Sequence, residues 1–289
     1  MDTYKIKPLL LLSLFAAFLV TPLFMAAPLF LAAPVAQAHE SNQHLLEQVI
    51  NGDHRDPANK ARDRYRHPLQ TLMFFGVKPD MTVVEIAPGG SGWYMELLAP
   101  YLRDNGKYYA ASYDQDSVVE YFRSNIKRFN NKVDARPDIY GKIVVTEFAP
   151  PKKLAIAPED SADMVLTFRN VHNWMGGDAA EQAFATFYKT LKPGGILGVV
   201  EHRADNGQPQ DPKAKSGYVR EDYVIELAQA AGFQLLAKSE INSNPKDSKD
   251  HVKGVWTLPP SLRGGDGKEE QYRAIGESDR MTLKFVKPE

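Results

Sequence analysis

Short apolar runs and stretches with helical spacing alternate along most of this 289-residue chain. Runs rich in valine, isoleucine, leucine and aromatic residues, bounded by turn residues, predict strands at 82–86, 107–113, 142–148, 164–168, 195–201, 233–240 and 281–286. Apolar residues recurring every three or four positions predict helices at 68–76, 93–102, 117–129, 178–191 and 220–231. Strands separated by helices favour an α/β fold with a doubly wound, mostly parallel seven-stranded sheet covered on both faces.

An N-terminal helical segment, residues 39–76, precedes this sheet. Its first apolar residues, between Leu45 and Ile50, have helical spacing. A strongly charged stretch follows, and we interpret residues 62–67 as a solvated helix face with local ion pairs. Because this segment lies just before the first strand, three of its residues could instead form a lid over the site. These are Asp63, Arg66 and His67.

The first 38 residues resemble a secretory signal. Lys5 and Lys7 precede a long apolar run that ends in Ala36-Gln37-Ala38, a small-x-small pattern that signal peptidases recognise. Such a signal would direct the chain to the periplasm, and cleavage after Ala38 would release the mature protein. The run is also long enough for a membrane anchor, but its three prolines disfavour one unbroken helix. We therefore expect an exported protein that meets the membrane only transiently.

Composition and charge narrow the kinds of site that the chain can hold. It has no cysteine, which excludes disulfides, cysteine-ligated zinc and a thiol nucleophile. Lys and Arg number 35 against 36 for Asp and Glu, so the net charge of −1 gives no bulk attraction to nucleic acid. No two histidines lie three or four residues apart, and we predict no metal site. A small molecule remains as the expected partner, and the oligomeric state stays open.

The most informative segment is the turn that follows the first predicted strand. Glycines let a backbone approach a ligand closely, and the start of the next helix offers free amides. The expected cofactor contacts in this turn are Ala87, Gly89, Gly90 and Gly92. Asp114 ends the second strand, where an acid can accept hydrogen bonds from both hydroxyls of a ribose. Glu85 suits an ammonium group better than a pyrophosphate, which favours S-adenosylmethionine over NAD.

The turn resembles motif I of class I S-adenosylmethionine-dependent methyltransferases, Asp/Glu-x-Gly-x-Gly-x-Gly, with Ala87 and Ser91 replacing two glycines. The segment 191–195, Leu-Lys-Pro-Gly-Gly, is similar to the family's turn before strand five. Arg169-Asn170-Val171 is similar to the Arg-Asn-Val of ubiquinone and menaquinone C-methyltransferases. The resemblance covers most of the chain after the signal, which also resembles a bacterial group of predicted exported methyltransferases.

This resemblance implies a Rossmann-like methyltransferase domain over residues 77–289 with S-adenosylmethionine as its cofactor. Asp114 matches the family's ribose-binding acid, and Glu147 and Phe148 match the region that touches adenine. The implied reaction is methyl transfer to a small acceptor, quinone-like or derived from a lipid.

Removal of a proton from the acceptor needs a base, and histidine suits that role near neutral pH. His172 and His202 follow the fourth and fifth strands and are the catalytic candidates. The substrate-binding candidates are Arg169, Asn170, Trp174, Arg203 and His251.

Two other functions compete with methyl transfer. An exported enzyme needs a supply of S-adenosylmethionine outside the cytoplasm, so the fold could have lost catalysis and act as a periplasmic ligand-binding protein. Ala87 and Ser91 favour that alternative, whereas the retained Glu85 and Asp114 favour an enzyme. An NAD-linked oxidoreductase is the third hypothesis, and Glu85 argues against it.

Overall fold

The computed structural model describes Met1, Thr3 and residues 32–289, and it leaves out the side chains of residues 32–39. The chain divides into two units, Met1–Ala38 and His39–Glu289, and the second unit holds the features discussed below. Most of the predicted signal segment lies outside the described residues. Among the described helices, none is both long and apolar enough to cross a membrane.

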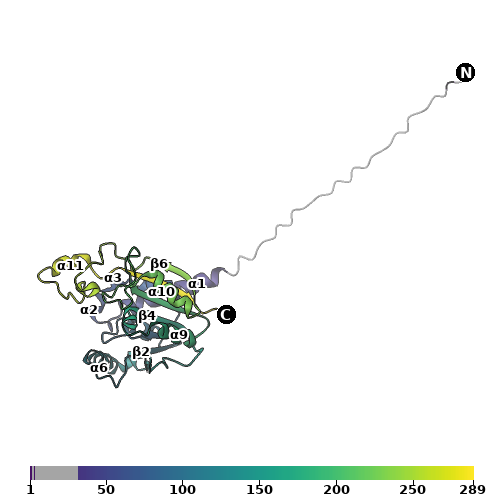
Figure 1. Cartoon of the computed structure of the whole chain (residues 1–289). Coiled ribbons are helices and arrows are strands. Elements are labelled where there is room, and N and C mark those ends of the chain that lie inside the picture. Colours follow the sequence, from purple (N-terminus) through teal and green to yellow (C-terminus); the bar gives the residue numbers. More distant parts are fainter. Residues whose placement is uncertain (2, 4–31) are drawn as a thin grey trace. The chain divides into compact units, whose positions relative to one another are not determined.

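A seven-stranded sheet forms the centre of the second unit (Figure 1). Its strands are β1 (Thr82–Ile86), β2 (Lys107–Ser112), β3 (Val144–Glu147), β4 (Ala162–Phe168), β5 (Leu191–His202), β6 (Gln234–Ser239) and β7 (Arg280–Val286). They lie in the order β3-β2-β1-β4-β5-β7-β6. The neighbours from β3 to β5 pair in parallel, and β7 runs antiparallel to both β5 and β6. The predicted mostly parallel, seven-stranded fold class is confirmed.

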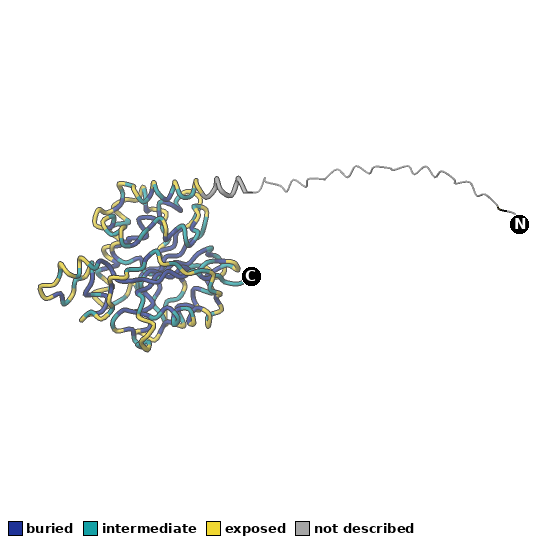
Figure 2. The backbone as a smooth tube through the Cα atoms, turned by 90° about the horizontal axis from the view of Figure 1, so that it is seen from above, coloured by how far each residue is buried: buried dark blue, intermediate teal, exposed yellow. Residues whose placement is uncertain are grey.

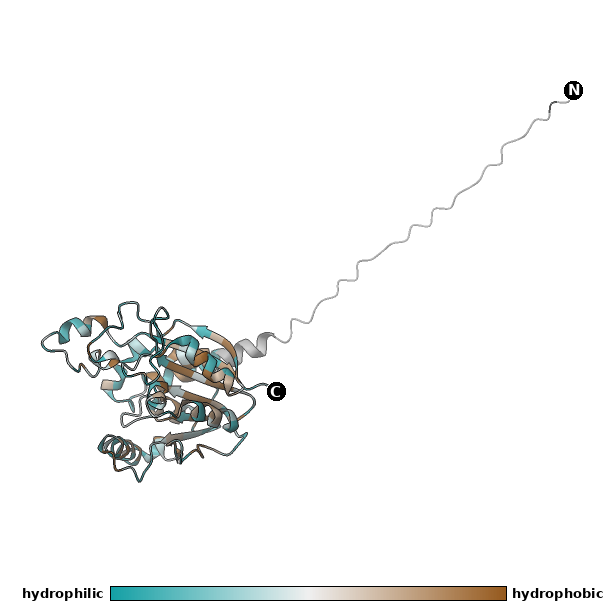
Figure 3. Ribbon diagram, viewed as in Figure 1, coloured by the Kyte–Doolittle hydropathy of each residue, from teal (hydrophilic) through white to brown (hydrophobic). Residues whose placement is uncertain are grey.

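Helices cover both faces of this sheet, as expected for parallel strands joined by crossovers. One face packs against α8 (Val171–Gly176), α9 (Ala180–Thr190) and α10 (Glu221–Ala230). The other packs against α1 (Ala32–Asn51), α4 (Pro68–Phe75), α5 (Met95–Leu102), α6 (Glu120–Ala135) and α7 (Pro137–Tyr140). Neighbouring residues in a strand point to opposite faces, so Val83 and Val84 enter different cores. Figures 2 and 3 show the buried and hydrophobic residues gathered on the central strands.

Four short helices lie in the segments before β1 and between β6 and β7. They are α2 (Pro57–Lys60), α3 (Asp63–Arg66), η1 (Gly254–Thr257) and α11 (Glu269–Ile275). Asp56 caps α2 by accepting a hydrogen bond from the amide of Ala58 at 2.8 Å. Helices α1 to α4 cover most of residues 39–76, with α1 beginning earlier, at Ala32. The bounds of this segment and its use as a lid stay predictions.

The strand order reverses at β1, because β2 and β3 lie on one side of it and β4 and β5 on the other. Ligands of doubly wound sheets bind outside the carboxyl ends of the strands at such a switch point. Asn170 closes the strand ends there, since its Nδ2 donates to the carbonyl of Ile86 at 3.1 Å and to Oγ1 of Thr167 at 3.2 Å.

Candidate functional site

A cavity of about 1230 Å³ lies along the carboxyl ends of the parallel strands. Residues that follow β1, β2, β3, β4 and β5 in turn all contribute to its wall. In that order they are Ala87–Ser91, Tyr113 with Asp114, Phe148, Arg169 with Asn170, and His202. The cavity therefore begins at β3, passes the glycine-rich turn at the switch point and ends beyond β5.

The glycine-rich turn supplies the middle of this wall. Gly89 has φ 70° and Gly92 has φ 56°, values that glycine adopts without steric cost. Ala87 also has a left-handed φ, 49°, so alanine occupies a conformation that favours the glycine of the family motif. A Cβ on Gly89 would meet nothing within 4 Å, which leaves open space beside the backbone at this point.

Glu85 lies beneath the turn and is not part of the cavity wall. It is 3% exposed and accepts a hydrogen bond of 2.6 Å from the hydroxyl of Tyr108. Burial raises the pKa of Glu85 to about 8, although that hydrogen bond and the nearby Arg66 oppose the shift. In this structure Glu85 is therefore mostly neutral at pH 7 and supports the turn from behind, rather than presenting a charge to a ligand.

Asp114 lines the cavity beside Tyr113, as expected for a ribose-binding acid. Its Oδ1 accepts from Nζ of Lys153 at 2.5 Å and from the amide of Asp116 at 3.0 Å. The hydrogen bond from Lys153 holds the pKa of Asp114 below its usual range. Its Oδ2 accepts no hydrogen bond from any described residue and remains available to a ligand hydroxyl.

Of the two predicted adenine contacts, one lines the cavity and the other does not. Phe148 lines the cavity and meets Trp174 edge-on, with ring centroids 5.7 Å apart. Glu147 lies outside the cavity wall and accepts from Lys153 at 2.9 Å and from the amide of Gln115 at 2.7 Å. Glu147 therefore fixes the loop after β2 instead of facing the cavity.

Both predicted catalytic histidines line the far end of the cavity, with ring centroids 5.4 Å apart. Glu201, fully buried at the end of β5, accepts from the amides of His172 and His202 at 3.3 and 2.8 Å. Nδ1 of His172 lies 3.1 Å from the same carboxylate. Because that carboxylate acts as an acceptor, Nδ1 carries the proton, and Nε2 of His172 is left as a lone-pair acceptor.

His202 differs from His172 in its partner. Its Nδ1 forms a hydrogen bond of 2.5 Å with the hydroxyl of Ser278. Burial, together with His172 and three nearby arginines, holds the pKa of His202 well below its usual range. His202 is therefore a neutral polar group at pH 7, and His172 is the better placed of the two to accept a proton. Sequence analysis did not single out Glu201 or Ser278, whose partners become neighbours only in the folded chain.

Donor atoms of His172, Glu201 and His202 lie within 4.8 Å of one another, so these residues could in principle hold a metal ion. The carboxylate oxygens of Glu201 already accept from two backbone amides and one imidazole. A metal would have to displace those bonds, so we assign Glu201 to holding the histidines.

The five predicted substrate-binding residues fall into two groups. Three line the cavity: Arg169, Asn170 and Trp174. Arg203 and His251 lie outside it, and their partners explain why. Both oxygens of Glu240 and both of Asp279 accept from Arg203 at 2.7–3.0 Å. His251 forms a 2.9 Å hydrogen bond with the buried Asp247.

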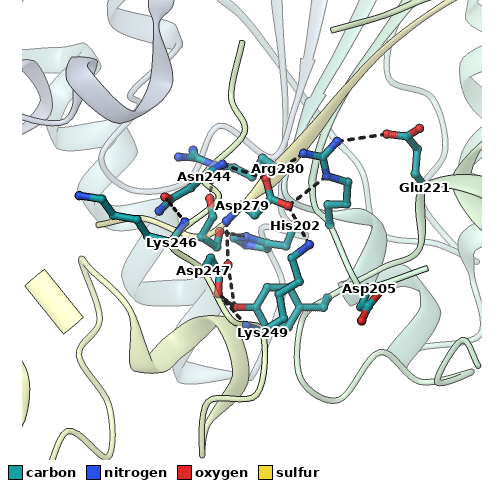
Figure 4. Close-up of polar contacts among 12 residues, drawn as sticks. His202, Asp205, Glu221, Asn244, Lys246, Asp247, Lys249, Asp279 and Arg280 are labelled. Carbon is teal, nitrogen blue, oxygen red and sulfur yellow. Dashed lines mark hydrogen bonds and ion pairs between the residues drawn. The ribbon is translucent and has the colours of Figure 1, made fainter. Parts of the chain in front are cut away.

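Their partners Asp247 and Asp279 belong to a polar network with Lys249, which Figure 4 shows. Asp247 accepts from the hydroxyl of Tyr218 and, at 2.7 Å, from the amide of Asp279. Lys249 adds an ion pair of 2.9 Å to Asp279. The network fixes the chain just before β7, where Glu277 and Ser278 line the cavity. Arg203 and His251 thus contribute to the site through its support.

The charged segment before β1 is not the solvated helix face that its sequence indicated. Arg66 is 1% exposed, and its Nε lies 3.4 Å from Glu277, 211 residues away along the chain. The guanidinium also lies over the ring of Trp93, 4.8 Å from the ring centroid. Asp63 pairs with Arg55 at 2.6 Å. The prediction was wrong because Arg62 and Arg66 bind Glu277, a carboxylate that is distant in sequence.

The same segment is attached to the glycine-rich turn. Nδ2 of Asn59 donates to the carbonyl of Ser91 at 3.1 Å, and Nε1 of Trp93 donates to the carbonyl of Asn59 at 2.8 Å. Asp56 and Arg62 from this segment line the cavity. The segment therefore forms part of the site wall in this conformation.

No family model matches the sequence, and no curated protein matches it. Several solved structures do match this chain. A SAM-dependent methyltransferase from Aquifex aeolicus aligns with a TM-score of 0.53 at 16% identity, covering 85% of this chain and 98% of that one. Haemonchus contortus phosphoethanolamine N-methyltransferase 2, in complex with S-adenosyl-L-methionine, aligns with a TM-score of 0.52 at 14% identity. That alignment covers 85% of this chain and 60% of that one. The chain has the fold of the SAM-dependent methyltransferases.

The fold alone leaves the reaction open. The (4+2)-cyclase SpnF aligns with a TM-score of 0.55 at 16% identity, covering 88% of this chain and 96% of that one. A protein named as a cyclase thus matches as well as those named as methyltransferases. Any assignment of activity has to rest on the residues of this cavity.

Proposed function

We propose that this protein transfers a methyl group from S-adenosylmethionine to a small-molecule acceptor. The observation that carries the proposal is the distribution of chemistry along one cavity. A free acidic oxygen of Asp114 and the ring of Phe148 lie at the β2–β3 end, and the histidine pair lies at the β5 end. Ligand pockets usually measure roughly 300–1,000 Å³. This cavity, at about 1230 Å³, is large enough for a cofactor and an acceptor together.

The residues at the β2–β3 end fit the cofactor. Asp114 would accept the ribose hydroxyls through Oδ2, and Phe148 with Tyr113 would provide apolar surface for adenine. The open space beside Gly89 allows the chain joining ribose to the amino-acid end to pass the turn. When bound, S-adenosylmethionine supplies a methyl group activated by its sulfonium.

His172 would then act on the acceptor. Nε2 of His172 would accept the proton that the acceptor loses when it is methylated. Glu201 keeps the imidazole in the required tautomer and stabilises the imidazolium that forms. His202, held neutral, can orient the acceptor by hydrogen bonding. The acceptor itself, which the sequence suggested to be quinone-like or derived from a lipid, stays open.

Binding of the cofactor is the first test. Calorimetric titration of the purified chain should show binding of S-adenosylmethionine and of S-adenosylhomocysteine. Asp114→Asn should weaken both by about 10- to 100-fold, because hydrogen bonds to a charged group contribute about 1.5–3 kcal/mol. Asp116→Asn is the matched control, since Asp116 shares Lys153 with Asp114 but is 88% exposed. Absence of binding at millimolar ligand, or equal effects of both variants, would contradict the proposal.

A ligand-binding protein without catalysis is the alternative, and the match to a cyclase shows that this fold is not restricted to methyl transfer. Incubation with cofactor carrying a labelled methyl group and an extract of small molecules distinguishes the two. Transfer of label that is lost in His172→Gln supports the enzyme. Tight binding without transfer supports the alternative.

Export is a separate proposal, based on the apolar run before Ala36-Gln37-Ala38. Fractionation of cells followed by N-terminal sequencing should find the chain in the periplasm and beginning at His39. An intact N-terminus in the membrane fraction would indicate an anchor instead.

A further inference from the structure

Four arginines gather around one carboxylate at the β4–β5 end of the cavity. Nε of Arg62 lies 2.6 Å from Glu277, Nε of Arg66 lies 3.4 Å from it, and Nη1 of Arg280 lies 3.2 Å from it. Arg169, directly after β4, is the fourth. Its pKa falls to about 10, mainly through burial and then through the charge of Arg62. These residues come from three distant parts of the chain and meet only in the fold.

Several N–H groups of this cluster lack partners. Nη2 of Arg62 and Nη2 of Arg66 are buried and form no hydrogen bond with any described residue. Arg66 is itself 1% exposed, so its unused N–H groups have been removed from bulk water. A buried donor without an acceptor carries a free-energy cost, which is larger when the donor is charged. A bound acceptor would remove this cost.

Arg169 presents a further set of donors to the cavity. It lines the wall, and its guanidinium has no hydrogen-bond or ion-pair partner among residues 40–289. The backbone places it there at some cost, because φ is 64° in a residue with a Cβ. The amide of Arg169 donates to the carbonyl of Val200 at 2.7 Å, which holds this conformation.

The charges of the cluster do not balance. Four arginines against Glu277 alone leave three positive charges. Asp63 cannot compensate them, since both of its oxygens bind Arg55 at 2.6 and 2.9 Å. Glu85, with its pKa raised to about 8, is mostly neutral at pH 7. An uncompensated buried charge is costly, so the cluster favours an anionic ligand.

We propose that Arg62 and Arg169, which line the cavity, bind an anionic group of the acceptor, a carboxylate or a phosphate, and so make the substrate an anion. The planar guanidinium matches both groups with paired N–H donors. Arg169 directly follows β4, the strand that neighbours β5, and His172 lies in the first turn of α8. The anion and the reacting atom would therefore occupy the same half of the cavity. This inference rests on the proposed methyl transfer, because it assigns that half to the acceptor.

Inorganic phosphate and benzoate are the probes, titrated calorimetrically into the full chain at low salt. Both should bind, and Arg169→Gln should weaken each at least tenfold. Arg128→Gln is the matched control, because Arg128 lines the same cavity beside Asn125 and the glycine-rich turn. It should leave both affinities within twofold of the original. Equal binding of phosphate and benzoate to the unchanged chain and to Arg169→Gln would overturn the proposal.

The cofactor also carries a carboxylate, and a second pair of probes separates it from the acceptor. S-adenosylhomocysteine has that carboxylate, and 5′-methylthioadenosine lacks the amino-acid end. If Arg169→Gln weakens the first tenfold and not the second, the arginines bind the cofactor and the proposal is wrong. If both bind as before while phosphate binding is lost, the acceptor assignment is supported. If S-adenosylhomocysteine binds neither protein, the proposed function fails, and the acceptor assignment fails with it.

Stability offers a readout that does not depend on the cofactor. Glu277→Gln removes the single carboxylate from the cluster, and phosphate should then raise the melting temperature of the variant by several degrees more than that of the unchanged chain. An equal shift in both would contradict an anion site at these arginines.

Discussion

Replacing Glu85 by Gln should make this protein more stable at neutral pH, although it alters the acid of a nucleotide-binding motif. The carboxyl is 3% exposed, and burial raises its pKa to about 8. At pH 7 the folded protein therefore holds a proton on Glu85 that the unfolded chain releases. Gln keeps the shape and the carbonyl oxygen that accepts from Tyr108, and it has no charge to desolvate.

The sign and size of the effect follow from the two pKa values. Because the folded value is raised above the unfolded value of 4.5, stability is greatest below about pH 4.5 and falls as pH rises to about 8. Each pKa unit corresponds to about 1.4 kcal/mol. Between about pH 5 and pH 7.5 this one group should cost the unchanged protein about 3 kcal/mol of unfolding free energy, and Glu85→Gln should lose that dependence.

Guanidinium unfolding at the two pH values, followed by tryptophan fluorescence, measures the unfolding free energy and its dependence on pH. The exposed Glu159→Gln is the control and should keep the pH slope of the unchanged protein. Glu277→Gln should have the opposite effect and lower the unfolding free energy at neutral pH. Burial would raise the pKa of Glu277, but Arg66, Arg280 and Arg62 hold it well below its usual range. Its stabilising effect is therefore present above about pH 4.5 and is lost only in acid.

One result would refute this reasoning. If Glu85→Gln is less stable at pH 7.5 and keeps the original slope, Glu85 is ionised in the fold and Arg66 neutralises it. The arginine cluster would then carry one positive charge fewer than we assign to it.

Two further substitutions test the site and its turn. Glu201→Gln should lower kcat by about 10²- to 10⁴-fold through loss of the base held at His172, while calorimetry finds S-adenosylhomocysteine affinity unchanged; a matching loss of affinity would mean that the change is structural. Ala87→Gly should leave the unfolding free energy unchanged or raise it by up to about 1 kcal/mol, because Ala87 has φ 49°. Ala185→Gly, in the exposed interior of α9, should instead cost about 1 kcal/mol, and similar losses in both would show that Ala87 is not strained.

Local patterns predicted the strands of this fold well. The structure has β1 at the predicted Thr82–Ile86, and the bounds of β2, β6 and β7 lie within one residue of the predicted ones. The fifth strand was predicted at 195–201, but β5 begins earlier, at Leu191, in the segment predicted as a turn. Burial on both faces gives the central strands β1 and β4 apolar runs that the sequence displays directly. The position of β7 between β5 and β6 has no such local signal, because strand order depends on tertiary contacts. The short α8 was missed because six residues hold too little helical periodicity.

The sequence predicted those residues of the site that lie at or just after the ends of strands. Asp114, Phe148, Arg169, His172 and His202 line the cavity, and each lies at or just after a strand end. Glu201 was missed because a buried acid at the end of an apolar strand shows nothing of its partners. Arg203 was expected in the cavity from its position after β5, but four acidic oxygens draw it into the supporting network.

The two halves of the cavity are built from different parts of the chain. This difference affects which sequence changes can alter acceptor binding without altering cofactor binding. The β1–β3 half consists of strand ends and their turns, which the sheet itself positions. The β4–β5 half also needs Arg62 and Arg66 from before the sheet and Glu277 and Ser278 from its last connection. Glu277 joins these segments, since it binds arginines from both ends of the unit. Changes in the terminal segments can therefore alter which acceptor is bound while leaving the strand-end half, where we place the cofactor, intact.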